Sequence, residues 1–211
     1  MRLDHISYVA THDQISDVVN RIGSQIGTAF VDGGIHPKFG TRNFTAPLLN
    51  GQYIEVVCPL DHPATDTTPF GMAVKKKADE GGGWFTWVIS VTNLNSLEEV
   101  MNRKAVSGER KKPNGENLFW KQIGINNLDK NPNYPFYIQW ISKNHPSLDG
   151  IPKAKISELT FCGLEFNEIS NSKVKISDLS LDCNLKFEKS NDNIGPKSVT
   201  FVVEERSIVI N

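Results

Sequence analysis

Two stretches near the N-terminus, Leu3–Val9 (LDHISYV) and Tyr53–Val57 (YIEVV), decide the fold because both return later in the chain. Their counterparts in the second half are Phe85–Val91 (FTWVISV) and Tyr137–Ile141 (YIQWI). All four are short runs rich in β-branched and aromatic residues, which is typical of buried β-strands. The chain therefore contains an internal repeat, so the residues between the matching stretches are interpreted as parts of two copies of one unit.

The spacing of the landmarks supports a duplication of about 83 residues. Three pairs recur at distances of 82, 84 and 83 residues: His5 and Trp87, Glu55 and Gln139, and the histidines of two His-Pro pairs, His62 and His145. We interpret the three nearly equal distances as two copies of one structural unit.

Each copy reads as a strand, a helix and three further strands. Apolar residues recur at helical spacing over Ile15–Ile26, where Gly27 supplies a stop, and again over Leu94–Met101, which we expect to end at Gly108. Asn50-Gly51 predicts a tight hairpin between two strands. The sequence thus predicts an α+β protein with tandem βαβββ modules at residues 1–68 and 83–150, paired in one domain (1–150) and joined by a helical linker.

Residues 151–211 form a β-rich C-terminal extension with two alternative explanations. Short apolar runs predict four strands, and Lys173–Leu181 is compatible with a short helix between the first two. That order is compatible with a third, degenerate module. The alternative is an unrelated extension that covers a sheet edge.

Composition excludes several classes of function. The chain has 211 residues and a net charge of -1, so no global field attracts nucleic acid or an anionic membrane. It has no apolar run of membrane-spanning length, and because Asp4 and His5 stand where a signal peptide would be apolar, we do not expect secretion. The three cysteines are widely spaced and form neither a zinc motif nor a disulfide framework. We expect a protein of the reducing cytoplasm.

The paired modules, with His5 on the first strand and Glu55 on the fourth, resemble the vicinal oxygen chelate superfamily of glyoxalases, bleomycin-resistance proteins and extradiol dioxygenases. Within it, the chain is most similar to the glyoxalase-like domain family. The matching stretches are Leu3–Ile6, His36–Asn43, Tyr53–Val57, Arg110–Gly115, Leu118–Trp120, Pro135–Trp140 and His145-Pro146. The resemblance implies a curved, half-open sheet around a small-molecule pocket.

The resemblance also implies where a metal would bind. The four ligand positions of the superfamily fall on His5, Glu55, Trp87 and Gln139. An imidazole and a carboxylate suit a divalent ion, but an indole cannot ligate and an amide oxygen is a weak ligand. His5 and Glu55 would therefore make a weak, incomplete metal site that the substrate or another side chain must complete.

A metal-free interpretation uses the same two residues as catalytic groups. Glu55 on an inward strand face is costly to keep charged, so we expect a raised pKa or a partner such as His5. A His–Glu pair in a pocket can move a proton next to a carbonyl group, and we expect Glu55 to transfer the proton with assistance from His5. The structural alternative is a hydrogen bond that locks two strands together.

Six further residues are candidates for ligand binding. His36 follows a glycine-rich stretch and is either a binding residue in a loop at the pocket mouth or an exposed loop histidine. Arg110 begins a short basic run that is typical of a solvated face, with the edge of the pocket as the alternative. Aromatic residues on strands belong either to the core or to a flat ligand-stacking wall. The predicted ligand-binding set is His36, Asn43, Trp87, Trp120, Gln139 and His145.

Two functions from different classes remain open at this point. The first is a glyoxalase-like enzyme that acts on a small organic molecule by proton transfer or metal-assisted chemistry, in the manner of a lyase, an isomerase or a dioxygenase. The second is a bleomycin-resistance type of protein that sequesters a small molecule without turnover. In the related fold such proteins enclose the ligand between subunits, so a homodimer would favour the second.

Overall fold

The computed structural model describes residues 1–128, 132–163, 181–190 and 194–211. The first module contains one helix and four strands: β1 (Arg2–Val9), α1 (Ile15–Ile26), β2 (Val31–His36), β3 (Thr41–Pro47) and β4 (Tyr53–Pro59). A short 3-10 turn, η1 (Leu49–Gly51), connects β3 to β4. Asn50 and Gly51 both have positive φ, 62° and 68°, which is the backbone of the tight hairpin turn that the Asn-Gly pair predicts.

The second module repeats this order after a helical linker. The linker consists of α2 (Pro63–Thr67) and α3 (Pro69–Asp79). The module itself contains β5 (Gly83–Ser90), α4 (Asn95–Met101), β6 (Val106–Lys111), β7 (Asn117–Ile123), η2 (Ile125–Asn127), β8 (Phe136–Trp140) and η3 (Pro146–Leu148). In both modules the first strand pairs in parallel with the fourth. The predicted α+β class and the tandem βαβββ arrangement are confirmed.

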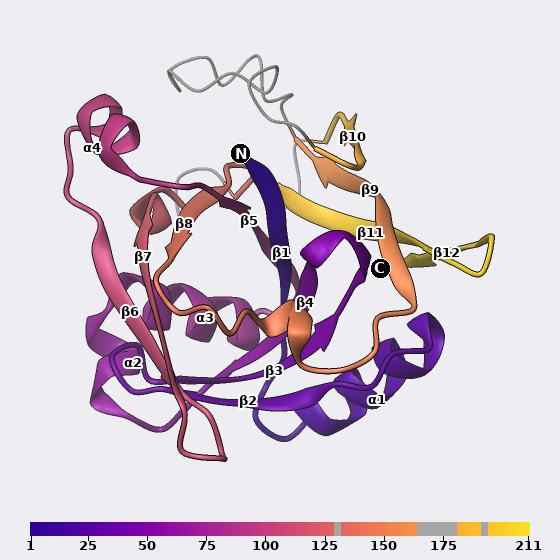
Figure 1. Cartoon of the computed structure of the whole chain (residues 1–211), viewed down its shortest axis with the longest axis horizontal. Helices are drawn as coiled ribbons and strands as arrows, with labels where there is room; N and C mark the ends of the chain where they lie inside the picture. Colours follow the sequence, from indigo (N-terminus) through magenta and orange to yellow (C-terminus); the bar gives the residue numbers. More distant parts are fainter. Residues whose placement is uncertain (129–131, 164–180, 191–193) are drawn as a thin grey trace.

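The two modules close into one eight-stranded barrel in the order β1-β4-β3-β2-β6-β7-β8-β5. The strands form a ring around a central axis, and α3 lies across one end of it (Figure 1). The ring is therefore more closed than the half-open sheet that was expected. It closes through β2 and β6, where the register records a single pair, Ile35 with Lys111.

The C-terminal extension is a separate four-stranded sheet with the order β10-β9-β11-β12. Its strands are β9 (Ala154–Cys162), β10 (Asn184–Glu188), β11 (Gly195–Val203) and β12 (Arg206–Ile210). The modules instead have the order first-fourth-third-second, so the described strands do not repeat the modular topology. Most of the predicted helix Lys173–Leu181 lies outside the described residues.

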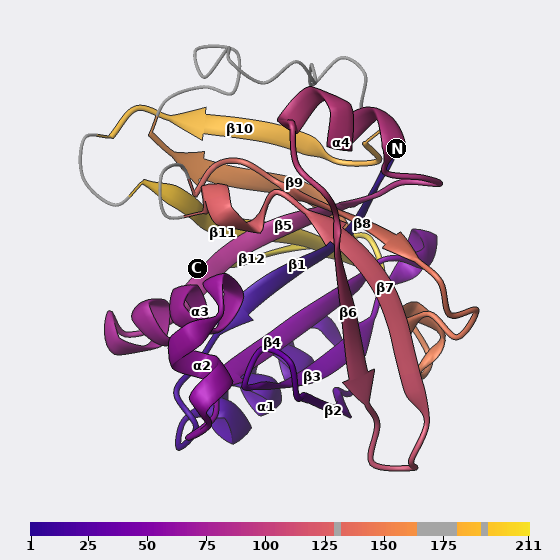
Figure 2. The same ribbon diagram turned by 90° about the vertical axis from the view of Figure 1, so that its left-hand side faces the viewer.

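The extension packs on the outside of the barrel, against β5 and α1 (Figure 2). Trp84 donates its indole N–H to the carbonyl oxygen of Ile210 at 2.8 Å. Trp87 is fully buried, and its ring centroid lies 5.5 Å from that of Phe161 on β9. The apolar residues between barrel and sheet, including these aromatics, belong to one continuous core. No helix among the described residues has the length and apolar character to cross a membrane.

The helix boundaries agree with the sequence analysis at one end and differ at the other. Gly27 ends α1 in the left-handed conformation, as predicted. Helix α4 ends earlier than predicted, at Asn102, and Gly108 lies inside strand β6. Three strands were expected after this helix, but the one that is β6 could not be located from the sequence, because its polar and charged residues favour a loop when they are considered without their neighbours.

We predict that Trp87 stabilises the fold as a core residue. Its removal in Trp87→Ala should lower the free energy of unfolding by about 3–5 kcal/mol, the usual cost of deleting a large buried aromatic side chain. Urea denaturation of the purified variant measures this change. Phe119→Ala is the control: Phe119 lies on a strand of the same barrel but is 42% exposed, and should cost under about 1 kcal/mol. Equal losses in the two variants would contradict the assignment.

Candidate functional site

A small polar cavity lies inside the barrel, surrounded by residues of both modules. Its volume is about 30 Å³, far smaller than the hundreds of Å³ that enclose a whole drug-sized ligand. Five of the predicted site residues line it: His5, His36, Asn43, Glu55 and Trp120. In the described conformation the cavity has room for one small chemical group.

Glu55 on β4 is buried, and both of its carboxylate oxygens accept hydrogen bonds. Ser7 Oγ donates to Oε2 at 2.7 Å, and Asn43 Nδ2 donates to Oε1 at 2.6 Å. Burial alone would raise the pKa of Glu55, but the nearby histidines and these two hydrogen bonds outweigh it and lower the pKa. Of the two predicted ways to accommodate a buried Glu55, the structure has the second, in which hydrogen-bond partners surround the carboxylate. Glu55 is therefore ionised at neutral pH.

His5 on β1 forms a hydrogen bond with the residue that precedes it in the sequence, Asp4. The register of β1 against β5 shifts between Leu3 and His5, which makes Asp4 the extra residue of a β-bulge. Asp4 is fully buried, and its Oδ1 lies 2.8 Å from His5 Nδ1. Burial would raise the pKa of Asp4, but hydrogen bonds from His145 and His5 hold it well below its usual value.

The ionised state of Asp4 determines the tautomer of His5. A carboxylate only accepts hydrogen bonds, so His5 Nδ1 carries the proton that it donates to Asp4. The other ring nitrogen, Nε2, lies 4.0 Å from Glu55 Oε2. The ring of Tyr53 stacks on His5 with centroids 4.3 Å apart. His5 is thus fixed in orientation, with a nitrogen free to accept a proton when the ring is neutral.

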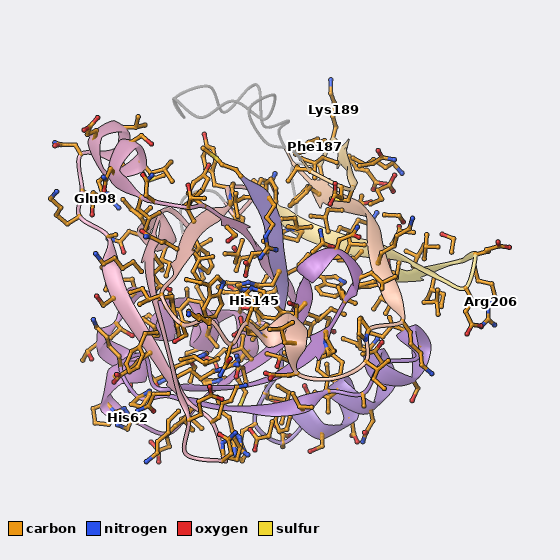
Figure 3. All side chains as sticks on the ribbon, viewed as in Figure 1. His62, Glu98, His145, Phe187, Lys189 and Arg206 are labelled. Carbon is orange, nitrogen blue, oxygen red and sulfur yellow. The ribbon has the colours of Figure 1, made fainter. Side chains whose placement is uncertain are left out.

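His145 does not line the cavity, although it was predicted to bind the ligand. Its Nε2 donates to Asp4 Oδ2 at 3.1 Å, while Nδ1 accepts from the backbone N–H of Ser147. Figure 3 shows His145 beside η3, among the side chains within the ring of strands. His62, its counterpart in the first module, lies at the periphery and caps α2 instead. His145 contacts the site only through Asp4.

His36 lies in strand β2, not in a loop, and its side chain is buried. Strand alternation explains the difference, because β2 directs His36 inward while the glycines before it leave no side chain to reveal the pattern. His36 Nδ1 lies 2.9 Å from Thr41 Oγ1. Burial lowers the pKa of His36 to about 4, assisted by the charges of Arg110 and His5 and opposed by Glu55. His36 is therefore neutral at pH 7.

Trp120 forms one wall of the cavity, as predicted. Its indole Nε1 donates to Gln122 Oε1 at 2.7 Å, and its ring meets His36 edge to face at 5.7 Å. These contacts fix the plane of the indole, so Trp120 offers a rigid apolar surface to a group in the cavity.

Trp87 and Gln139 do not line the cavity, and a one-residue error in the repeat explains why. The parallel pairs His5–Tyr53 and Ser7–Glu55 correspond to Val88–Phe136 and Ser90–Ile138, a uniform offset of 83 residues. A shift of one residue turns a side chain to the opposite face of a strand. The counterparts of His5 and Glu55 are therefore Val88 and Ile138, both buried and apolar.

The strand register determines which side chains are available to bind a metal ion in the cavity. Val88 and Ile138 carry no ligand atom, and each oxygen of Glu55 already accepts a hydrogen bond. The guanidinium of Arg110 lines the same cavity, and its positive charge opposes a cation there. Within the described ranges, no group of three or more His, Cys, Asp or Glu side chains could hold a metal ion. The cavity does not fit a resident divalent ion, and the weak site predicted at His5 and Glu55 lacks the ligands to complete it.

Two of the other hollows in the described structure lie beside residues of the barrel strands. A shallow apolar groove of about 80 Å³ includes Pro69, Val106 and Ile125, and it shares Phe39, Phe70 and Gln122 with the polar cavity. A larger hollow of about 590 Å³ lies between α3, β5 and the C-terminal sheet, and its described lining includes three lysines but no histidine. The groove is the feature that could receive the remainder of a ligand whose head occupies the cavity, since the two share a wall.

Two residues of the site, Ser7 and Asp4, were not predicted from the sequence, and a third, Arg110, was expected at the pocket only as an alternative. Ser7 could have been found by strand alternation, because it lies two residues after His5 on the same face. Arg110 lines the cavity on β6, whereas its basic run favoured a solvated face. Asp4 had no sequence signal, since a regular strand would direct it away from His5 and only the bulge brings the two together.

Comparisons with known proteins agree with this architecture. Residues 3–176 match the family model described as a glyoxalase-like domain. The chain belongs to the glyoxalase-like domain family, and its fold is that of the vicinal oxygen chelate superfamily. The resemblance stated from the sequence is thereby confirmed. A search of curated proteins found no match.

Solved structures of similar fold include one of comparable length. A hypothetical protein from Staphylococcus aureus is 17% identical with a TM-score of 0.68, over 97% of this chain and 92% of the other. Methylmalonyl-CoA epimerase from Mycobacterium tuberculosis is 12% identical with a TM-score of 0.45, over 65% of this chain and 85% of the other. At these identities the similarity concerns the fold.

We predict that His36 makes the protein less stable in mild acid. An unfolded histidine titrates near 6.5 and folded His36 near 4, so between these values the unfolded chain binds more protons. Stability therefore falls as the pH drops from 7 to 5, by about 2 kcal/mol from this residue. Urea denaturation at the two pH values measures the fall.

The variant His36→Gln should remove most of that fall, because an amide does not titrate. His12→Gln is the matched control, since His12 is exposed on the loop after β1. An unchanged pH dependence in His36→Gln would show that another group causes it.

Proposed function

We propose that the protein is an enzyme that moves a proton on a small organic molecule, with His5 as the proton acceptor. The observation that carries this proposal is the hydrogen bond of 2.8 Å between buried Asp4 and His5 Nδ1. A histidine whose far nitrogen is held by a carboxylate has the arrangement of a general base. Asp4 acts through His5 and is a positioning residue.

Glu55 has a different role from the one first assigned to it. Its two oxygens are engaged by Ser7 and Asn43, and its pKa is lowered, which makes it a weak base. A carboxylate 4.0 Å from His5 Nε2 instead stabilises the imidazolium that forms when His5 takes a proton. His5 is the acceptor, and Glu55 and Asp4 hold the resulting charge from both sides.

The chemistry that suits this arrangement is removal of a proton from a carbon next to a carbonyl group. The C–H bond breaks, the proton moves to His5 Nε2, and the electron pair moves onto the carbonyl oxygen to form an enolate. Return of the proton from His5 to the same carbon restores the carbonyl group and the neutral imidazole. When the enolate turns over in the site before this step, the proton arrives on the opposite face and the product is the epimer. The enclosed cavity excludes bulk water from the enolate. Trp120, His36 and Asn43 would orient the reacting group.

We predict that the protein exchanges such protons for deuterium. Small carbonyl compounds in D2O should lose their α-proton signal in the ¹H NMR spectrum when the wild-type protein is added. In His5→Gln the rate should fall by roughly 10²-fold or more, the usual contribution of a general base. His12→Gln should keep the wild-type rate, because His12 is exposed on the loop before α1.

Three outcomes separate the proposal from its rivals. Exchange that persists in His5→Gln rejects His5 as the base. Exchange that is lost with a chelator and restored by a divalent ion requires a metal-assisted route. A compound that raises the melting temperature without any exchange favours the sequestering function, for which the apolar Val88 and Ile138 are the supporting observation.

A further inference from the structure

Arg110 is a buried cation for which the described structure provides no counter-ion. The side chain lines the polar cavity and is 2% exposed. Its Nη1 donates to Asn43 Oδ1 at 3.3 Å. Nε and Nη2 have no hydrogen-bond partner among the described residues, and no carboxylate there forms an ion pair with Arg110. An ionised group in this condition is strongly unfavourable unless a ligand completes it.

The two free nitrogens are the pair that binds a carboxylate best. Nε and Nη2 lie on one edge of the planar guanidinium, so their N–H bonds run parallel. Two parallel donors match the two oxygens of a carboxylate, in the bidentate geometry that distinguishes arginine from lysine. A cavity of about 30 Å³ suits one such planar group.

The surroundings of Arg110 keep this edge free. Asn43 connects Arg110 to Glu55, because its oxygen accepts from Arg110 and its nitrogen donates to Glu55. Glu55 is thereby satisfied without a direct ion pair to the guanidinium. Gly33 on β2 leaves the necessary space: a Cβ there would lie 2.1 Å from Asn43 Oδ1 and 2.8 Å from Arg110 Nη1. Any larger residue at position 33 would displace the pair.

We propose that Arg110 binds the carboxylate of the ligand, and that the ligand is a small organic acid whose head group enters the barrel cavity. This inference rests on the proposed use of the cavity as the ligand site, and it names the class of molecule that enters. The acid's remaining atoms extend past Phe39 and Phe70 into the adjoining groove.

The test compares acids with their uncharged amides. Sodium acetate and sodium pyruvate should raise the melting temperature of the wild-type protein at constant ionic strength, while acetamide and pyruvamide should not. In Arg110→Met the affinity for both acids should fall at least tenfold. Arg206→Gln should bind as the wild type does, because Arg206 lies at the tip of the β11–β12 turn, far from the cavity (Figure 3).

A second measurement separates a ligand-binding role from a structural one. Without ligand, Arg110→Met should melt no lower than the wild type, because the substitution removes an uncompensated buried charge. A lower melting temperature together with unchanged acid binding would overturn the proposal. Acids and amides that act equally, or acids that do not bind the wild type, would also overturn it. Inorganic phosphate that stabilises as well as acetate would overturn the assignment to carboxylates.

The variant His5→Gln keeps this inference distinct from the proposed reaction. Acid binding that persists in His5→Gln supports the role of Arg110 even if no proton exchange is found. Proton exchange by the wild type on neutral carbonyl compounds, without any preference for acids, supports the reaction and rejects the role of Arg110.

Discussion

The Asp4 carboxylate, which has no contact with water, accepts hydrogen bonds from His5 beside it and from His145, 141 residues further along the chain. Trp140 adds its indole N–H at 3.2 Å. A buried negative charge is tolerated only when it is surrounded by donors, so these groups must come together when the barrel forms. The same contact fixes the proton on His5 and links the end of the second module to the first strand. Both the docking of the His145 segment on β1 and the protonation of His5 depend on it.

The two modules differ in the polarity of the side chains that they direct into the barrel. The first contributes His5, His36, Asn43 and Glu55, whereas the positions of the second module that match His5 and Glu55 hold Val88 and Ile138. An ancestral pair of equal modules would present four similar side chains to one centre. Here half of the interior is polar and half is apolar, so a ligand meets charge on one side and hydrocarbon on the other. Arg110 and Gln122 are exceptions, because the second module supplies these polar side chains to the cavity.

Much of the architecture follows from the sequence, because duplicated strands and helical periodicity survive in the residues themselves. His5, Glu55 and Asn43 could be assigned to the cavity through the family resemblance, and Trp120 because an aromatic residue on a strand can form a flat wall. The failures have a common physical origin in the two-residue period of strands. An offset of 82 or 84 in place of 83 selected Trp87 and Gln139, which face away from the cavity. The glycines of β2 and the charged residues of β6 hid two strands, and with them the burial of His36 and Arg110. The bulge at Asp4 depends on pairing with β5, which no local pattern reveals.

The closure of the barrel between β2 and β6 has a mechanical consequence. One registered pair, Ile35 with Lys111, joins these strands, whereas other neighbours in the ring share three to seven. Because β2 and β6 share so few backbone pairs, separating these two strands costs less free energy than separating any other neighbours in the ring. The residues beside that pair are His36 and Arg110, which are the groups that a ligand must reach. The place in the ring with the fewest registered pairs is therefore next to two of the buried groups that line the cavity.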